Sequence, residues 1–515
     1  MGYIAKLGGL VHGPLGSVMN EYVLCAVSVF ILGLVIWSSH SRHGDVPRVG
    51  KAPGWFGLAA AKRDFILNGM RIIDEGYHNY KDSMFMVQTA DMERIILSTK
   101  YLDELKSVPE DILSLRVGMS QRHLGKYTGL DIILTSHLQN EVCKSHLTQN
   151  LNKLIFPMQE ETDFWLAQMM PDTNQSPAEI NAYSASLRIV AAMTSRVFGG
   201  LTVSRDERWL RTAADYTLDV FRISMALRPY PSFLRGIVAP WLECTKRRDE
   251  HIKIATECFG GMFAKRLASH DADEVPNDNM VQWMVDAATD GDRNPDVLVR
   301  KLLFLTLAAV HTSTMSVTHA VFDLCAYPHY IEVLREEVLE MVKRHGWTLA
   351  GINNMITLDS FLKESQRVNH PGLLSFNRKV VRAFRLSDGV TIPPGSFISM
   401  ATNSVARDSE YYASPDQFDG FRFYKQRLAS PAEINKHQFV STGPDSLPFG
   451  HGKFACPGRF YAAAQVKILL ASVLIKYEIS FGGGQTTRPR NIFAGESIGI
   501  DRTQTVVFKP RESKV

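Results

Sequence analysis

The hydrophobic and polar positions of the chain repeat with the period of an α-helix over most of its length from Phe56 onward. Residues 206–227 and 298–325 are long and apolar on at least one face. Residues 330–345 are clearly amphipathic, and Gly346 follows them as a helix terminator. The apolar face of this segment consists of Ile331, Leu334, Val338, Met341 and Val342. The periodicity therefore predicts a mainly helical protein.

Strand signals are few and concentrate in one region. The best are residues 379–384, 390–392 and 396–400, separated by the turn residues Ser387-Asp388-Gly389 and Pro393-Pro394-Gly395. No internal repeat, low-complexity stretch or linker interrupts residues 56–515. We therefore expect one large domain, mainly α with a small β portion.

An uncharged apolar run, residues 22–37, precedes this domain. At about 1.5 Å per residue it gives roughly 24 Å of helix, slightly short for a bilayer, and Tyr22 and Trp37 suit the two interfaces. A cleaved signal peptide is the alternative, although no Ala-x-Ala site follows the run. Basic residues after the run favour a cytosolic domain. We expect a luminal N-terminus (1–21), a transmembrane signal anchor (22–37), a linker (38–55) and a folded domain (56–515) at the endoplasmic reticulum membrane.

The connector at residues 228–242 is unusually apolar for a segment between helices. One interpretation is a loop buried in the core. The other is a segment that dips into the membrane beside a substrate entrance.

The composition of the chain argues against several functional classes of protein. The net charge of +4 is too weak to indicate a nucleic-acid partner. The 6 cysteines are scattered and form no CxxC pair, which argues against zinc and against a disulfide framework and fits a reducing compartment. The chain has no Walker A motif and no convincing GxGxxG after a strand.

The strongest chemical signal is the glycine-bracketed loop at residues 449–460, which contains Cys456. Gly450 and Gly452 allow a sharp turn and a close approach to a flat partner. Pro457 suits the first position of a helix that residues 460–475 continue. The sulfur of Cys456 is thereby placed at a helix N-terminus, where a thiolate is favoured and suits an axial ligand of haem iron. A buried structural thiol is the alternative.

This segment resembles the cysteine-ligand loop of the cytochromes P450, Phe-x-x-Gly-x-Arg-x-Cys-x-Gly. Phe449, Gly452, Cys456 and Gly458 match at the family spacing, whereas Phe454 stands in place of the family's Arg. The resemblance implies a haem cofactor whose iron is ligated by Cys456. It also implies that another cation must neutralise a haem propionate, and Arg378 is the best placed.

A second signature precedes the loop. Glu364 and Arg367 form an ExxR motif, and Arg422 lies between aromatic residues before the cysteine loop. ExxR alone usually marks a solvated ion pair. The resemblance implies that Glu364, Arg367 and Arg422 form a buried ion network that holds the haem-side core. The family usually has Pro where this chain has Gly420.

A third signature lies in the predicted helix at residues 298–325. His311 and Thr312 follow Ala308-Ala309-Val310 in an otherwise apolar stretch. The segment is similar to the family's oxygen-binding kink, and the resemblance implies that Thr312 guides protons during oxygen activation. His311 replaces the usual acid and relays protons in one interpretation. In the other interpretation His311 is a satisfied core histidine, and the Thr312 hydroxyl merely bonds to its own helix backbone.

The resemblance implies a membrane-anchored haem monooxygenase that oxidises a bulky lipophilic substrate, terpenoid or meroterpenoid in filamentous-fungal secondary metabolism. The same resemblance implies that electrons come from NADPH through a membrane-bound haemoprotein reductase, which is expected to dock on a basic face around Lys453, Arg459 and Lys467. The pocket is expected from residues 113–135, 221–240, 371–376 and 495–500 and the oxygen-site helix. The alternatives are a reductase-independent enzyme that rearranges or dehydrates a peroxide, and a non-enzymatic haem sensor. Thr312 and the intact oxygen-site helix speak against both.

Overall fold

The computed structural model describes residues 46–52, 57–169, 176–269 and 278–511. The predicted luminal N-terminus and transmembrane anchor lie outside these residues. The described chain is mainly helical. Its α-helices are α2 (Leu58–Asn79), α3 (Leu102–Leu105), α4 (Leu115–Arg122), α5 (Gly125–Thr128), α6 (Leu138–Val142), α7 (Leu151–Met169), α8 (Ala182–Gly199), α9 (Leu201–Ser204), α10 (Glu207–Leu227), α11 (Ser232–Val238), α12 (Glu243–Ala268), α13 (Met280–Asp286), α14 (Pro295–Ala326), α15 (His329–His345), α16 (Leu349–Asn354), α17 (Ile356–Val368), α18 (Thr402–Val405), α19 (Arg422–Arg427) and α20 (Arg459–Lys476).

The strands form four small sheets in the described chain, with the orders β1-β2-β3-β9-β6-β4, β10-β13-β5, β11-β12 and β7-β8. Their bounds are β1 (Arg48–Val49), β2 (Met84–Gln88), β3 (Glu93–Leu97), β4 (Leu113–Ser114), β5 (Ala178–Asn181), β6 (Ser375–Val380), β7 (Phe384–Arg385), β8 (Thr391–Ile392), β9 (Phe397–Met400), β10 (Tyr477–Phe481), β11 (Ile492–Ala494), β12 (Ser497–Gly499) and β13 (Thr505–Pro510). Part of the predicted linker 38–55 joins the largest sheet, because β1 pairs in parallel with β2.

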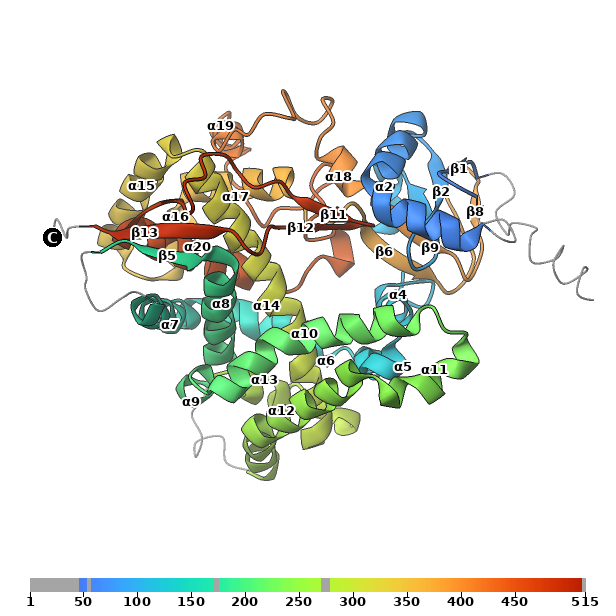
Figure 1. Ribbon diagram of the computed structural model, residues 1–515, viewed down its shortest axis with the longest axis horizontal. Helices are drawn as coiled ribbons and strands as arrows, with labels where there is room; N and C mark the ends of the chain where they lie inside the picture. The colour runs from blue at the N-terminus through green and yellow to red at the C-terminus, as the bar shows by residue number, and fades with distance from the viewer. Residues whose placement is uncertain (1–45, 53–56, 170–175, 270–277, 512–515) are drawn as a thin grey trace, which may run out of the picture.

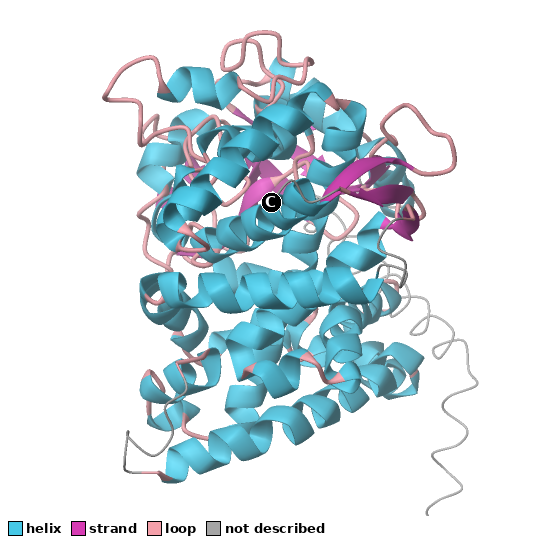
Figure 2. Ribbon diagram, turned by 90° about the vertical axis from the view of Figure 1, so that its left-hand side faces the viewer, coloured by secondary structure: helices cyan, strands magenta, loops and turns pink. Residues whose placement is uncertain are grey.

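The molecule has two unlike halves. Figure 2 shows the strands gathered in the upper half, whereas the lower half consists of helices. The 32-residue helix α14 passes through the centre (Figure 1) and packs against α8, α10, α12, α17 and α20. Among the described residues, α14 is the one helix whose length and composition would allow it to cross a membrane, and more than half of its most apolar stretch is buried inside the protein. It is the core helix on which the two halves meet.

The predicted helices match the structure closely. Residues 206–227 form α10, residues 298–325 lie within α14, and residues 330–345 lie within α15. Gly346 caps α15 with a φ of 64°, a conformation that glycine adopts without strain.

The predicted strand at residues 379–384 is interrupted. β6 ends at Val380 and belongs to the largest sheet, whereas β7 begins at Phe384 and pairs with β8 in a separate sheet. The alternation of apolar and polar residues cannot predict this change of partner strand, because it reports only on the local sequence.

The apolar connector at residues 228–242 contains α11, and no residue of α11 is buried. Phe233 is 76% exposed and Trp241 is 81% exposed. The prediction of a buried core loop is therefore wrong for this segment. α11 projects at the lower right of Figure 1.

Candidate functional site

The cysteine loop folds around one backbone hydrogen bond. The N–H of Cys456 donates to the carbonyl of Phe449 at 2.7 Å, which closes a loop that contains the 3₁₀-helix η6 (Gly452–Phe454) and precedes α20. Gly450 and Gly452 have φ angles of 67° and 69°, as the sharp turn requires. A Cβ on Gly452 would lie 2.5 Å from the Cβ of Lys106, so this glycine is required for packing against the end of α3.

Cys456 lies two residues before the N-cap of α20. Gly458 is the N-cap, so Pro457 precedes the helix and does not occupy its first turn as predicted. In the polypeptide itself burial raises the pKa of the Cys456 thiol, and the N–H of Gly458 and the charge of Arg459 offset this only partly. A metal cation bound to the sulfur would deprotonate it outright.

The middle of α14 has an unusual exposed turn. Ala308 and Thr312, one turn apart, are exposed although most of the helix is buried. The hydroxyl of Thr312 donates to the carbonyl of Ala308 at 2.7 Å, the back-bonded geometry of one of the two alternatives. Because the side chain is exposed, its oxygen retains lone pairs that can accept from a ligand or water. α14 packs against α20, the helix that follows the cysteine loop.

His311 has protein partners on both ring nitrogens. Nε2 lies 2.7 Å from the carbonyl oxygen of Ala214 on α10, and Nδ1 lies 3.0 Å from the hydroxyl of Tyr183 on α8. A carbonyl only accepts, so Nε2 carries the proton and Nδ1 accepts from Tyr183. Burial lowers the pKa of His311, with a smaller opposing effect from its bond to Ala214. The neutral imidazole therefore joins α14 to α10 and α8.

Arg378 is a buried cation with few partners. Its side chain is 3% exposed, and Nη1 donates to the carbonyl of Asn377 at 2.9 Å. Nε has no hydrogen-bond partner, and among the described residues no carboxylate forms an ion pair with this guanidinium. Burial lowers the pKa of Arg378 to about 10, which the nearby charge of Glu110 only partly offsets. The guanidinium centre lies 5.2 Å from the ring centroid of Phe454, the residue that replaces the family's Arg.

Glu364, Arg367 and Arg422 form the predicted buried network. Arg367 donates to both oxygens of Glu364, at 2.8 Å from Nε and 2.7 Å from Nη2, and Arg422 Nε donates at 3.1 Å. The remaining N–H groups of both arginines are bonded to backbone carbonyls of the chain at residues 406–417. Removing one partner of such a buried set strands a charge and costs roughly 3–5 kcal/mol. The network holds α17 to the segment before α19.

The departure at Gly420 has a structural reason. Its backbone N–H donates to the hydroxyl of Tyr330 at 3.0 Å, a bond that proline cannot form. A Cβ at this position would lie 2.9 Å from the ring of Phe361. Glycine thus allows α15 and α17 to close around this turn.

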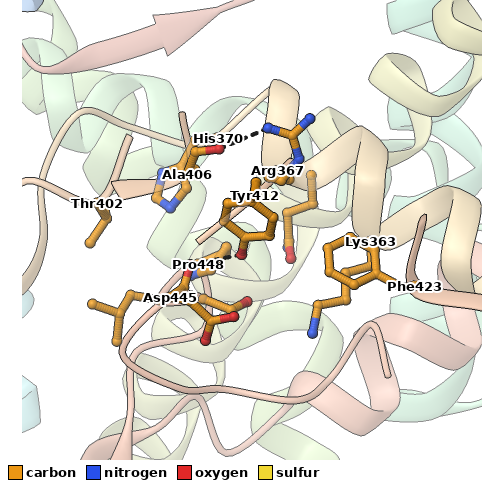
Figure 3. A pocket seen from close by; sticks show the side chains of 12 residues that line it. Lys363, Arg367, His370, Thr402, Ala406, Tyr412, Phe423, Asp445 and Pro448 are labelled. Atoms are coloured by element: carbon orange, nitrogen blue, oxygen red, sulfur yellow. Dashed lines mark hydrogen bonds between the residues drawn. The ribbon is translucent and has the colours of Figure 1, made fainter. Parts of the chain in front are cut away.

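A small cavity adjoins the network and is distinct from the cysteine loop. Figure 3 shows Arg367, His370, Tyr412 and Lys363 around it, with the hydroxyl of Tyr412 bonded to the carbonyl of Asp445 at 2.9 Å. Its volume of about 10 Å³ is too small for a substrate and matches at most a single water. It belongs to the structural core.

The predicted basic docking face needs one correction. Lys453 is exposed, and Arg459 is half-buried with Nη1 bonded to the Cys456 carbonyl at 3.0 Å. Lys467 is 4% exposed, and its ammonium lies 2.7 Å from Asp359. The prediction for Lys467 is therefore wrong, because a second buried ion network uses this lysine. Lys144, exposed in the helical turn Cys143–Leu147, lies beside the loop instead and donates to the Lys453 carbonyl at 3.2 Å.

Sequence reasoning missed Tyr183 as the partner of His311. Tyr183 lies in the first turn of α8, far from any motif, and nothing in the local sequence distinguishes it. The buried ion network that pairs Asp359 with Lys467 was not predicted either, because nothing in the local sequence distinguishes these residues.

Comparison with known proteins agrees with this geometry. Residues 125–503 match the family model Cytochrome P450. The chain is 39% identical over 443 residues to a cytochrome P450 monooxygenase of Emericella nidulans, which covers 85% of this chain and 83% of the relative. It is 35% identical over 497 residues to a cytochrome P450 monooxygenase of Penicillium janthinellum, 95% of each chain. It is 35% identical over 473 residues to an ent-kaurene oxidase of Gibberella fujikuroi, 91% of this chain and 92% of the relative.

A cysteine-bearing loop followed by a helix that packs against a long core helix defines the class of thiolate haem proteins to which this architecture corresponds. The chain belongs to the cytochrome P450 family and is a cytochrome P450 monooxygenase. The family implies a haem-thiolate cofactor. The residues present fit it, because Arg378 is a buried cation with no carboxylate partner in the described part of the chain, and α14 has an exposed turn in its middle. Enzymes of this family take electrons from a reductase and oxidise small molecules.

Proposed function

We propose that this monooxygenase holds haem through the thiolate of Cys456 and oxidises a bulky lipophilic terpenoid. The observation that carries the haem assignment is the closed loop, in which the Cys456 N–H is bonded to the Phe449 carbonyl. When bound, the haem supplies oxygen activation and one-electron chemistry. The chain supplies the ligand and the proton path.

Six residues have assigned roles in this proposal. Cys456 ligates the iron, and Arg378 neutralises a propionate, since its guanidinium is buried without an acid partner among the described residues. Thr312 presents a hydroxyl from the exposed turn of α14 and passes protons toward the reacting oxygen. Glu364, with its two arginines, keeps the surrounding core rigid.

The substrate class rests on the relatives. One relative is named an ent-kaurene oxidase, and the relatives act in terpenoid biosynthesis. At 35% identity over 91% of this chain, the same class of substrate is the best supported, and a fungal source and secondary metabolism follow the same relatives. The side chains that line the pocket determine which carbon is oxidised and how many oxidation steps follow.

A reconstituted assay tests the proposal. The full chain with an NADPH–haemoprotein reductase is expected to give a type I spectral shift and an oxygenated product with ent-kaurene, and neither with lauric acid, an unbranched lipophile. Turnover of lauric acid without any shift by diterpenes would overturn the substrate class. Conversion of a hydroperoxide without NADPH or reductase would instead support the peroxide-rearranging alternative.

We further propose that the protein faces the endoplasmic reticulum membrane with its folded domain in the cytosol. Support comes from the exposed apolar side chains of α11 and the turn after it, where Phe233, Ile237 and Trp241 are 76%, 65% and 81% exposed. Leu67 of α2 is 69% exposed, and both helices lie toward the right-hand side of Figure 1. An apolar surface of this kind suits a bilayer interface.

Topology has a direct test. Asn174, which lies outside the described residues, begins the sequon Asn174-Gln175-Ser176. In the proposed orientation it remains unmodified. A glycosidase-sensitive mass shift at Asn174 in the native host would place the domain in the lumen.

The reductase is proposed to dock on the cysteine-loop side, through exposed Lys453 and Lys144. Changing both to Glu should weaken reductase binding mainly through the association rate and make it less dependent on salt. An unchanged reductase Michaelis constant in that variant would exclude this face.

A further inference from the structure

A charged cluster joins the two halves of the molecule at a distance from the cysteine loop. It consists of Asp91, Arg94, Arg122, Arg228 and Glu496. The five residues come from five places: the turn between β2 and β3, β3 itself, the last residue of α4, the C-cap of α10 and the turn of the β11–β12 hairpin. Segments that are remote in sequence therefore share one set of ionic contacts.

The sheet side of the cluster is firmly built. Arg94 is 1% exposed and donates to Glu496 at 2.6 Å and to Asp91 at 2.8 Å. Its Nη1 also lies 3.2 Å from the side-chain oxygen of Asn377. Burial by itself raises the pKa of Asp91 and of Glu496, but the charges of Arg94 and Arg122 outweigh it and hold both pKa values below the usual range. Both carboxylates are ionised at neutral pH.

The hairpin that carries Glu496 is fixed to α2. α2 is kinked at Asn68, and the carbonyl of Ile66 accepts from the N–H of Gly495 at 2.9 Å. Gly69 permits this approach, because a Cβ there would lie 2.4 Å from the Gly495 carbonyl oxygen. The backbone of Glu496 is also held, since its carbonyl accepts from Leu373 at 2.8 Å. Glu496 is thus part of the rigid sheet half.

α10 is attached to the cluster more weakly than α4, which packs against β6 and carries Arg122. Arg122 donates from Nε to Asp91 at 3.0 Å and also pairs with Glu496. Arg228, at the end of α10, donates to the carbonyl of Arg122 at 3.0 Å. Its nearest carboxylate oxygen, on Asp91, is 3.9 Å away, and its side chain is 28% exposed. Burial lowers the pKa of Arg228, and the pull of Asp91 does not fully compensate.

The asymmetry of charge explains which arm is weaker. Three guanidinium groups share two carboxylates, so one positive charge is left without its own counterion inside the cluster. Arg94 and Arg122 make the short contacts, and Arg228 makes the longest. A partly exposed contact of this kind contributes little free energy and is screened by salt. The connection through Arg228 can therefore break and re-form while Arg94 stays paired.

We propose that Arg122 and Arg228 form an ionic latch between the C-terminal end of α10 and the sheet half, and that a bulky lipophilic ligand enters when the Arg228 arm opens. The inference rests on the proposed haem site and substrate class. Only residues 229–231 separate Arg228 from α11, which carries exposed Phe233 and Ile237, so opening this arm moves the surface proposed to face the membrane. Arg122 and Arg228 are positioning residues that act on access and have no role in the chemistry.

The test compares two haem ligands of different size in the holoenzyme. In Arg228→Gln, clotrimazole is expected to bind and dissociate about 5-fold faster, which corresponds to about 1 kcal/mol, with little change in affinity. Cyanide, which is small, should bind at the parental rate. Added salt should accelerate clotrimazole binding to the parent and leave the variant unchanged.

The matched control is Arg235→Gln on α11. Arg235 bonds to the Tyr230 carbonyl and forms no ion pair with any described residue, so this change removes the same charge nearby without touching the latch. Parental clotrimazole rates are expected. The latch would be overturned if clotrimazole bound to Arg228→Gln and to the parent at equal rates at low salt. It would also be overturned if Arg228→Gln and Arg235→Gln accelerated clotrimazole binding equally.

A second measurement is independent of the haem assignment. Hydrogen exchange of the amides in α4 and at the C-terminal end of α10 should accelerate in Arg228→Gln, whereas the hairpin held by Ile66 and Arg94 should keep its protection. Unchanged exchange in α4 and α10 would exclude the latch even if the protein binds no haem. Lack of a carbon monoxide or azole spectrum would count against the proposed function alone.

Discussion

The hydroxyl of Tyr183 lies 3.0 Å from Nδ1 of His311, although 128 positions separate the two residues in the sequence. The other nitrogen, Nε2, lies 2.7 Å from the Ala214 carbonyl. The imidazole thus has no free ring nitrogen in the structure. This arrangement favours the core histidine over the proton relay.

His311→Leu is the first test. Losing both bonds and leaving the Tyr183 hydroxyl unpaired should reduce the free energy of unfolding by about 1–3 kcal/mol. Product formed per NADPH should remain close to the parental value. Tyr183→Phe should show a smaller loss of stability, since it removes only one bond. Normal stability combined with strong release of hydrogen peroxide in His311→Leu would instead establish the relay.

Thr312→Ala addresses proton delivery. The variant should fold and bind haem, because the Thr312 side chain is exposed and fills no core space. It should still consume NADPH but release hydrogen peroxide, and product per NADPH should fall about tenfold or more. Ser316→Ala is the control, one turn along, where the hydroxyl bonds to the Thr312 carbonyl at 3.2 Å. If Thr312→Ala forms as much product per NADPH as the parent does, the Thr312 hydroxyl serves only to bond to the helix backbone.

Cys456→Ser tests the iron ligand. A serine oxygen does not donate electron density as a thiolate does, so the red-shifted carbon monoxide band of the ferrous protein should disappear. Cys258→Ser, a half-buried cysteine of α12, should retain the band. A normal band in the Cys456 variant would refute the assignment.

Arg378→Ala should lower haem occupancy far more than Lys453→Ala. Arg378 is buried beside Phe454 without a carboxylate partner among the described residues, whereas Lys453 is exposed to water. The ratio of haem absorbance to protein absorbance after purification measures the difference, and Arg378→Lys should recover part of it by restoring the charge. Small, equal losses in the two alanine variants would mean that another group neutralises the propionate.

His370 predicts a pH dependence of stability. Burial lowers its pKa from 6.5 to about 4, with a smaller opposing effect from Gly372. Between these values the unfolded chain binds the proton and the folded protein does not, so this stabilisation is complete above pH 6.5 and is lost as the pH falls toward 4.

In His370→Gln the fall in unfolding free energy from about pH 7 to about pH 5 should be smaller by about 2 kcal/mol. Urea unfolding at the two pH values measures it. His345→Gln, at the exposed end of α15, should behave as the parent does. An identical pH dependence in the His370 variant would show that its imidazole titrates normally in the fold.

Elements whose signals are local could be predicted from the order of the amino acids alone. The apolar periodicity of α14, the amphipathic face of α15 ending at Gly346, and the i, i+3 spacing of Glu364 and Arg367 each involve residues one turn apart. Such patterns survive in the fold because helix geometry alone brings those side chains together. The motif around Cys456 likewise specifies its own turn, through Gly450 and Gly452.

The partners of groups that are distant in the sequence could be identified only in the folded protein. Lys467 carries the same charge as Lys453, yet packing of α20 places it against buried Asp359 instead of in solvent. His311 faces Tyr183, and Arg228 reaches Arg122, across loops that no local pattern describes. These contacts depend on how whole helices cross and pack, and a buried polar group takes whatever partner that packing places within reach.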